Sequence, residues 1–514
     1  MWASTSGKVD PPGRLRAGRG TIVVGLAIRS AGVILAIDQG TTGTTCIVFD
    51  EEGRPAGRAY REFEQHFPRP GWVEHDAAEI WDVTRAVARE AVDAAGSPQL
   101  AGIGITNQRE TVVAWDPRTG EPLHRAIVWQ DRRTAARCDE LRAAGHEPLV
   151  RERTGLVLDP YFSGTKIEWL RREGGVPDGA VFGTIDSWLV FKLTGRHVTD
   201  LSNASRTMLF DIRRLEWDAE LCDLLGVDPA VLPEPLPSAG VFGETTELGG
   251  SVPVAGIAGD QQAALYGQAC HTPGLGKNTY GTGSFVLVNA GAEAPPPVEG
   301  LLSTVAWGVE GRVDYAAEAA IFVTGAAVQW LRDALGVIGE AAETEALARS
   351  LDGNDGVYLV PAFTGLGSPH WDPYARGTIV GLTRGTGTAH LARAALESIG
   401  YQTVDAVRAM ESAAGLRLKE LRADGGAVQN AWLMQFQADV LGVPVVVPEV
   451  SETTALGAAY LAGVATGAWS EEDVRSMWRE AARHEPAMPA DERDELLAGW
   501  HRALDRSRAW ARDA

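Results

Sequence analysis

Residues 33–50, VILAIDQGTTGTTCIVFD, decide the fold of this chain. Two apolar runs, 33–37 and 46–49, flank a turn made almost wholly of glycine and threonine, with Asp38 at its entrance. This pattern predicts a β-hairpin with a polar tip. Backbone N–H groups and threonine hydroxyls at such a tip can donate to an anion, so the tip is a candidate phosphate site. An ordinary Gly/Thr turn without a ligand is the alternative.

Composition limits the classes of partner. The chain has 514 residues, more than one hydrophobic core usually supports, so two or more α/β domains are expected. Its net charge is −21 and it has no lysine- or arginine-rich stripe, so nucleic acid is not an expected partner. The few cysteines lack the spacing of a zinc site or a disulfide framework, which indicates a reducing, cytoplasmic location; they are Cys46, Cys138, Cys222 and Cys270.

The first 32 residues differ from the rest. Their charged side chains are five basic and one acidic, and they contain a short apolar run, 21–28, that Arg29 ends. A signal peptide would have a longer apolar core and a cleavage site, so we expect a disordered leader at 1–32. No later run approaches transmembrane length, and no membrane insertion is expected.

The opening hairpin begins a unit that the chain repeats. An extended run at 54–63 and a helix at 76–96 follow it, and strand 101–105 then ends in polar residues 106–110. Strand 252–258 likewise ends at Asp260, and open α/β sheets place ligands at such strand ends. A second Gly/Thr hairpin at 277–288 is followed by extended runs and by a helix at 325–335. This order predicts two related domains facing each other across a cleft.

The C-terminal third supplies one more candidate site. A strand at 418–423 is predicted to lead through the glycine pair 425–426 into a helix at 430–441, a turn that lets a flat ring or a phosphate approach the backbone. The last helix is expected at 453–465, where dense alanine and glycine favour close packing more than chemistry.

Long motifs then carry a resemblance. They include DQGTTGTT (38–45), GITNQRETVVAW (104–115), IVWQDRRTA (127–135), TGLVLDPYFSGTK (154–166), GIAGDQQAALYGQ (256–268), KNTYGTGSF (277–285) and DGGAVQN (424–430). In these the chain resembles the glycerol kinases of the sugar/polyol carbohydrate kinase family. The resemblance implies an α/β fold of two duplicated actin-like ATPase (ribonuclease H-like) domains with a central cleft. It implies an N-terminal domain at 33–280 with the glycerol and metal site, and a nucleotide-binding domain at 281–514.

The same resemblance implies ATP-dependent phosphorylation of glycerol to sn-glycerol 3-phosphate, with ATP and Mg²⁺. Asp260 would be the general base and Asp38 would hold the metal, through water because Mg²⁺ dehydrates reluctantly. The implied glycerol contacts are Arg109, Glu110, Trp129, Tyr161, Asp260, Gln261 and Phe285. The implied nucleotide contacts are Thr41, Thr42, Gly43, Thr44, Thr282, Gly325, Gln329, Gly426 and Asn430. A homodimer or homotetramer is expected by analogy alone.

Several alternatives stay open at this point. Asp260 could be the N-cap of the next helix, and Arg109 with Glu110 could be a solvated ion pair on a loop. The acceptor could be another polyol or a ketose, or the chain could be an actin-like ATPase module without an acceptor. One departure concerns the first hairpin tip: family members commonly have an arginine where this chain has Thr45, which predicts a raised KM for ATP.

Overall fold

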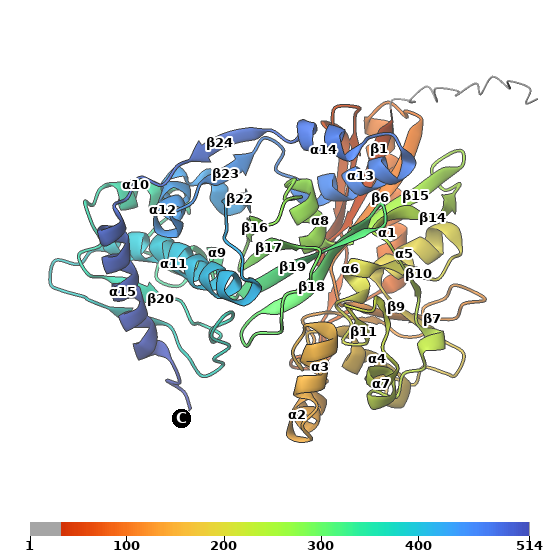
Figure 1. Cartoon of the computed structure of the whole chain (residues 1–514), viewed down its shortest axis with the longest axis horizontal. Helices are drawn as coiled ribbons and strands as arrows, with labels where there is room; N and C mark the ends of the chain where they lie inside the picture. Colours follow the sequence, from red (N-terminus) through yellow and green to blue (C-terminus); the bar gives the residue numbers. More distant parts are fainter. Residues whose placement is uncertain (1–31, 513–514) are drawn as a thin grey trace, which may run out of the picture.

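The chain folds into two lobes (Figure 1). The structure is a computed structural model that describes residues 32–512. The leader predicted at 1–32 therefore lies, apart from Gly32, outside the described residues. Within 32–512, no helix is both long and apolar enough to cross a membrane.

The first lobe is built on a six-stranded sheet. Its strands are β1 (Val33–Gln39), β2 (Gly43–Phe49), β3 (Pro55–Glu62), β6 (Leu100–Asn107), β14 (Ala239–Thr245) and β15 (Val252–Gly259). Their order across the sheet is β14-β15-β6-β1-β2-β3. β1 and β2 form the predicted hairpin and β3 the predicted extended run, which pairs antiparallel with β2, whereas β6 runs parallel to β1 and to β15.

The second sheet repeats this plan. Its strands are β16 (Leu275–Tyr280), β17 (Ser284–Gly291), β18 (Leu302–Val309), β19 (Arg312–Ile321), β22 (Glu420–Gly425), β23 (Val445–Pro448) and β24 (Glu480–His484). β19-β17-β16-β22-β23 has the same succession of antiparallel and parallel pairs as β3-β2-β1-β6-β15. The predicted duplicated fold is therefore confirmed.

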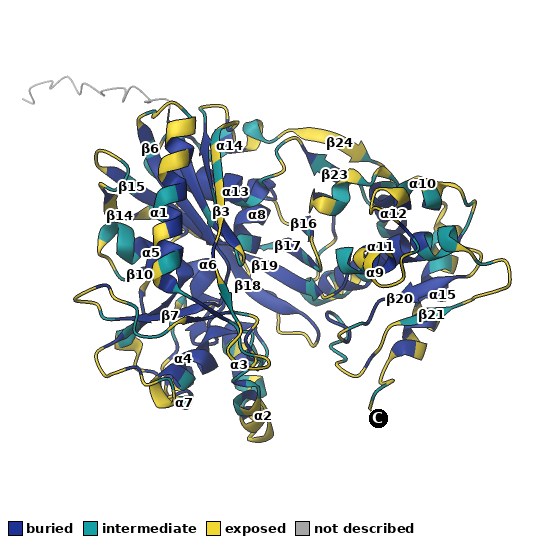
Figure 2. Ribbon diagram, turned by 180° about the vertical axis from the view of Figure 1, so that it is seen from behind, coloured by how far each residue is buried: buried dark blue, intermediate teal, exposed yellow. Residues whose placement is uncertain are grey.

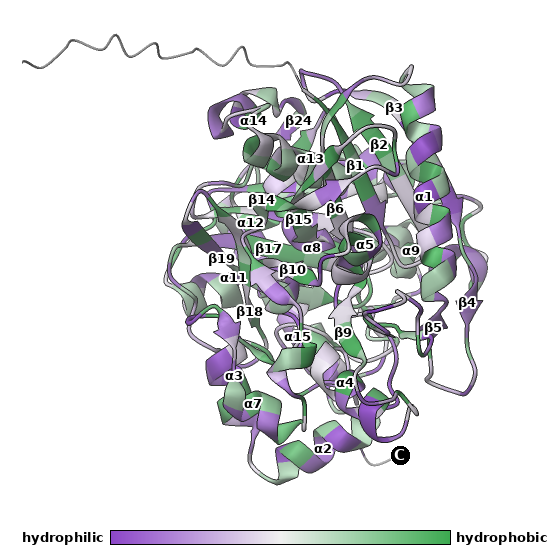
Figure 3. Ribbon diagram, turned by 90° about the vertical axis from the view of Figure 1, so that its right-hand side faces the viewer, coloured by the Kyte–Doolittle hydropathy of each residue, from purple (hydrophilic) through white to green (hydrophobic). Residues whose placement is uncertain are grey.

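Helices cover both faces of the first sheet. α1 (Ala77–Ala94) begins at the N-cap Asp76, whose carboxylate accepts from the N–H groups of Ala78 and Glu79. Its buried face packs on the sheet and its polar face is exposed (Figure 2). The two faces also separate by hydropathy (Figure 3). An apolar stripe facing the sheet is what fixes an amphipathic helix there.

The opposite face is covered by α8 (Asp260–Gly267) and α13 (Thr453–Thr466). α13 comes from far along the chain, yet it lies against the first sheet, as Figure 1 shows. Its glycines allow this approach, because a Cβ on Gly457 would meet the carbonyl oxygen of Ala263 at 1.8 Å. One hydrophobic cluster here joins residues of both sheets, so the lobes share a core. The domain division at residue 280 stays a prediction.

The expectation that helix 453–465 is the last was wrong. α14 (Glu471–Met477), β24 and α15 (Ala490–Ser507) follow it. α15 buries Leu497, Trp500 and Leu504 against the second lobe. The spacing of these three residues is helical, so the sequence carried the signal.

The remaining elements fill the lobes. In the first they are β4 (Gln65–His66), β5 (Glu74–His75), β7 (Val112–Trp115), β8 (Ala126–Ile127), α2 (Ala135–Ala143), α3 (Glu147–Thr154), α4 (Ser163–Arg172), β9 (Val181–Thr184), α5 (Ile185–Thr194), β10 (Val198–Asp200), α6 (Leu201–Ala204), β11 (Phe210–Asp211), β12 (Glu216–Trp217), α7 (Ala219–Leu224), η1 (Pro229–Val231) and β13 (Glu234–Leu236). In the second they are α9 (Gly325–Asp333), α10 (Glu343–Arg349), β20 (Tyr358–Val360), β21 (Thr378–Val380), α11 (Thr388–Ala414), η2 (Gly426–Gln429) and α12 (Ala431–Leu441).

Candidate active site

The site lies where the parallel strands of the first sheet end. Asp38 pairs in register with Thr106 of β6, which pairs with Ala258 of β15. Asp260 follows two residues later, as the first residue of α8. Because the carboxyl ends of parallel strands meet at one edge of a sheet, Asp38 and Asp260 face the same region. The sequence prediction of a site at this edge agrees with the register.

Asp260 is held by one of its two carboxylate oxygens. Oδ1 lies 3.1 Å from Arg109 Nε and accepts from the backbone N–H of Gln261 at 2.7 Å. Oδ2 has no partner among the described residues, and the side chain is 32% exposed. The N-cap of α8 is Gly259. The alternative that Asp260 is merely an N-cap is therefore wrong.

Asp38 is the candidate metal ligand. Burial, and secondly the charge of Asp260, raise the pKa of its carboxyl to about 7. A cation beside it would favour the ionised form and offset both effects. Within the described residues, no group of three or more His, Cys, Asp or Glu side chains is arranged to hold a metal. The carboxylate of Asp38, with that of Asp260 nearby, fits Mg²⁺. This ion commonly takes one or two carboxylates and completes its shell with water and phosphate oxygens.

Arg109 and Glu110 are buried, so the alternative of a solvated pair on a loop is wrong. Arg109 is 3% exposed and Glu110 is 1% exposed. Arg109 donates to both carboxylate oxygens of Glu318, at 2.7 and 3.0 Å. Arg206 bridges the two acids, donating to Glu110 at 2.7 Å and to Glu318 at 3.1 Å. The four groups form one buried ionic network beneath Asp260.

Glu318 and Arg206 were missed by sequence reasoning. Burial opposes the charge of Glu318, but Arg109 and Arg206 outweigh it and lower its pKa to about 2. Burial raises the pKa of Glu110, against the effect of the same two arginines. The signal was present in residues 315–321, YAAEAAI, where one carboxylate interrupts an apolar strand. A buried acid in such a strand requires a cationic partner.

Two predicted aromatic residues form a wall next to this network. The rings of Trp129 and Tyr161 meet edge to face with centroids 5.6 Å apart. Trp129 Nε1 donates to the hydroxyl of Thr41 at 2.9 Å, which ties the wall to the first hairpin tip. The third aromatic residue, Phe285, has the guanidinium of Arg109 5.9 Å from its ring centroid. The predicted glycerol contacts are thus brought together.

Buried Lys166 positions the loop that carries Tyr161. Its ammonium donates to the carbonyl oxygens of Pro160, Tyr161 and Phe162 at 2.6, 2.7 and 3.1 Å. Burial lowers the pKa of Lys166 to about 8. Three carbonyl oxygens satisfy all three ammonium donors, so Lys166 holds the backbone of this loop in place.

The first hairpin tip fits its predicted role only in part. Gly40 N donates to Gly43 O at 2.9 Å and closes the turn, and Thr42 is exposed at the tip. A Cβ on Gly43 would meet the carbonyl oxygen of Arg61 at 2.7 Å, which explains the glycine. The hydroxyl of Thr44 is buried 3.5 Å from that of Thr84. The Thr44 hydroxyl thus lies toward α1, and its contact with a nucleotide phosphate stays a prediction.

The second tip is joined to the start of α9. Thr282 O accepts from Thr324 N at 2.9 Å and from Ala326 N at 3.1 Å. Gly325 N donates to Gly281 O at 3.1 Å, and a Cβ on Gly325 would come within 2.5 Å of that oxygen. Glycine at 325 thus places the predicted residues Thr282 and Gly325 side by side.

The other predicted nucleotide residues lie in the second lobe. Gly425 comes against the end of β16, where a Cβ would meet Tyr280 O at 2.3 Å, but a Cβ on Gly426 would meet nothing within 4 Å. That open space suits a flat ring. Asn430 is the N-cap of α12, accepting from Leu433 N at 2.9 Å. Gln329 is exposed on α9 and bonds to no other described side chain.

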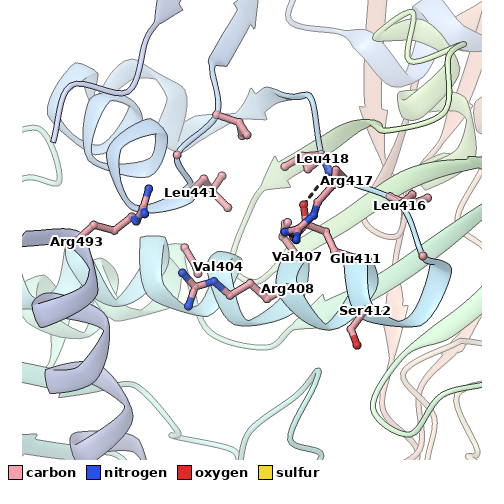
Figure 4. A pocket seen from close by; sticks show the side chains of 13 residues that line it. Val404, Val407, Arg408, Glu411, Ser412, Leu416, Arg417, Leu418, Leu441 and Arg493 are labelled. Carbon is pink, nitrogen blue, oxygen red and sulfur yellow. Dashed lines mark hydrogen bonds and ion pairs between the residues drawn. The ribbon is translucent and has the colours of Figure 1, made fainter. Parts of the chain in front are cut away.

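A separate groove in the second lobe is not part of this site. It has a volume of about 760 Å³ and is lined by α11, the segment 415–418 that precedes β22, the end of α12 and α15 (Figure 4). Its lining includes Val404, Arg408, Arg417, Leu441 and Arg493. None of the predicted site residues lines it.

Comparison with known proteins places the chain in a family. The N-terminal domain of the FGGY family of carbohydrate kinases matches residues 33–267, and its C-terminal domain matches residues 276–466. The chain belongs to the FGGY family of carbohydrate kinases. The family predicted from the motifs is thereby confirmed.

Relatives of this FGGY kinase share nearly its whole length. A glycerol kinase from Symbiobacterium thermophilum is 55% identical over 493 residues, covering 93% of this chain and 99% of the relative. Glycerol kinase 2 from Thermotoga maritima is 55% identical over 490 residues, with the same coverage. The structure of Plasmodium falciparum glycerol kinase with ADP is similar with a TM-score of 0.89 and 36% identity, covering 93% of this chain and 98% of that one.

The FGGY fold also accommodates other acceptors. A xylulose kinase from Rhodospirillum rubrum matches with a TM-score of 0.83 at 27% identity, covering 92% of this chain and 98% of that one. Because the fold is shared between kinases of different substrates, the acceptor is decided by side chains at the site.

Proposed function

We propose that this FGGY kinase transfers the γ-phosphoryl group of ATP to glycerol and forms sn-glycerol 3-phosphate. The observation that carries the proposal is the hydrogen bonding of the Asp260 carboxylate. Its Oδ1 is engaged by Arg109 and by a backbone N–H, whereas its Oδ2 is free and accessible beside buried Arg109 and Glu110. A free, oriented carboxylate oxygen at a strand end is what a base for an incoming hydroxyl requires.

The proposed reaction uses residues of both lobes. Asp260 Oδ2 takes the proton of a terminal glycerol hydroxyl as that oxygen bonds to the γ-phosphorus, and the bond from phosphorus to the bridging oxygen of ADP breaks. Arg109, Glu110 and Tyr161 hold the other hydroxyls, while Trp129 of the first lobe and Phe285 of the second cover the carbon chain and exclude water. Asp38 would hold Mg²⁺, which would neutralise charge on the phosphates when bound.

The nucleotide is proposed to lie between the two hairpin tips. The tip around Thr41–Thr42 and the tip at Thr282 belong to different sheets. The residues Gly325, Gln329, Gly426 and Asn430 then surround ribose and adenine. Because each lobe supplies one tip, approach of the lobes aligns donor and acceptor.

A coupled assay of ADP release tests the function. The expected result is ADP formation that requires glycerol and yields one glycerol phosphate per ADP. ADP release without glycerol would instead favour an ATPase module. A panel of other polyols and ketoses distinguishes the rival acceptors, and glycerol is expected to have the highest kcat/KM.

The proposal also covers the location and the oligomeric state of the enzyme. The cysteine usage and the metabolic substrate suit a cytoplasmic enzyme. A homodimer or homotetramer is proposed by analogy, and sedimentation velocity of the purified chain measures it. Neither nucleic acid nor a membrane is proposed as a partner.

A further inference from the structure

Lys277 is a buried cation that the proposed mechanism does not use. It lies in β16, is 0% exposed, and faces the first lobe from the second. Its ammonium donates to Gln261 Oε1 and, at 2.9 Å, to Thr279 Oγ1. Burial lowers the pKa of Lys277 to about 8, against the charges of Asp424 and Asp260. A cation held here without a carboxylate in direct contact calls for an explanation.

The contact with Lys277 determines which way the Gln261 carboxamide points. An ammonium has three donors and no acceptor, so the carboxamide atom that faces it must be the oxygen. The amide nitrogen Nε2 is then directed away from Lys277. Within the part of the chain that the structure describes, Gln261 Nε2 has no hydrogen-bond partner, although the residue is only 9% exposed.

A donor and an acceptor without partners among the described residues therefore belong to two consecutive residues at the start of α8. Gln261 follows Asp260 directly, and its backbone N–H holds Asp260 Oδ1 at 2.7 Å. Asp260 offers Oδ2 as an acceptor, and Gln261 offers Nε2 as a donor. A polyol satisfies both, because one hydroxyl gives its proton to the carboxylate while an oxygen of the substrate accepts from the amide.

We infer that Lys277 is a positioning residue of the acceptor site, fixing the Gln261 carboxamide as a donor toward the substrate. The inference rests on the proposed function, because it takes a hydroxylated acceptor beside Asp260 as given. It adds that the C-terminal FGGY domain, 276–466, completes an acceptor site whose other residues lie mainly in the domain matched at 33–267. Specificity for the acceptor thus depends on contact between the two domains.

A purely structural role for Lys277 makes a different prediction. If the ammonium only balances the charges of Asp424 and Asp260, its loss would act on the whole cleft. Asp424 already accepts from Gln268 at 2.8 Å and from Thr453 at 2.5 Å through Oδ2. Loss of Lys277 would then impair ATP and glycerol alike, and the effect would be independent of Gln261.

A double-mutant cycle separates the two roles. Lys277→Met and Gln261→Leu are each expected to raise the KM for glycerol about tenfold, with the KM for ATP changed less than about twofold. The double variant is expected to be no worse than either single variant, because both remove the same donor. Lys277→Arg keeps a cation that donates to Gln261 Oε1. Its KM for glycerol is expected to stay within about threefold of the wild-type value. Lys419→Met, at an exposed lysine, is the matched control and is expected to leave both constants unchanged.

Gln261→Glu keeps the inference testable if Lys277→Met fails to fold. A glutamate keeps an oxygen on Lys277 but replaces the amide donor with a second acceptor. The expected result is an unchanged melting temperature with glycerol affinity reduced about tenfold by calorimetry. Wild-type affinity in this variant, or multiplied effects in the double variant, would overturn the inference. Failure of the wild type to release ADP with glycerol would instead overturn the proposed function.

Discussion

Arg109 of the first lobe donates two hydrogen bonds to Glu318 of the second, at 2.7 and 3.0 Å, with both side chains buried. The same arginine lies 3.1 Å from Asp260 through its Nε. One guanidinium therefore connects the second sheet to the proposed base. Its planar fork suits this geometry, which a lysine would not reproduce.

Glu318→Ala is expected to destabilise the protein by about 3–5 kcal/mol, because it leaves Arg109 and Arg206 buried without their shared carboxylate. Urea denaturation followed by tryptophan fluorescence measures the decrease in the free energy of unfolding, taken from the first unfolding transition. Asp333→Asn, which breaks the exposed pair with Arg332, is the matched control and should leave the midpoint unchanged. Equal midpoints for the two variants would contradict a stabilising role for the buried network.

Asp260→Asn is expected to lower kcat by about 10²–10⁴-fold, the usual contribution of a general base. The fold should persist, since the amide oxygen can still accept from Arg109 and from the Gln261 N–H. Steady-state kinetics with a melting curve for each protein measures both quantities. Retention of more than a tenth of the wild-type kcat would rule out Asp260 as the base.

Thr45→Arg is expected to lower the KM for ATP by about tenfold, the equivalent of one charge-assisted hydrogen bond. Thr45 lies directly opposite Asp38 in the hairpin, so its side chain projects from the same face of the sheet. An arginine there would add a cation beside the phosphates. Thr45→Gln has similar reach without charge and serves as the control. An unchanged KM for ATP in Thr45→Arg would refute the prediction.

A pH-dependent contact fastens α15 to α11. His501 Nε2 lies 2.8 Å from Asp405 Oδ1, and this hydrogen bond raises the pKa of His501. A raised pKa in the folded state means that the stabilisation is present below the unfolded pKa, about 6.5, and is lost as the pH rises through the folded pKa. The melting temperature should therefore fall more between pH 6 and 8.5 in the wild type than in His501→Gln, by about 1–2 °C. Parallel curves for the two proteins would contradict this assignment.

Local patterns carried much of the fold. The Gly/Thr tips and the repeated order of hairpin, strand and helix predicted the duplicated plan that the strand order confirms. They did so because turns and amphipathic periods are properties of adjacent residues. The sequence also placed Asp260 at a strand end, where it lies.

Long-range pairing was beyond the reach of the same reasoning. Glu318 is 209 residues from Arg109, and the sequence around either residue does not predict that the two pair. Similarly, the sequence does not show that the Thr44 hydroxyl turns inward to Thr84. The side on which a threonine points depends on register, which is set by the assembled sheet.

The sequence by itself determined the family, the duplicated domains and the residue types of the site, because motif spacing and periodicity are written along the chain. Only the tertiary structure decided which oxygen of Asp260 is free, which way Gln261 points, and which acid neutralises Arg109. Each of these depends on a group from a distant strand, and an ion pair or an amide orientation exists only once two such strands are packed together.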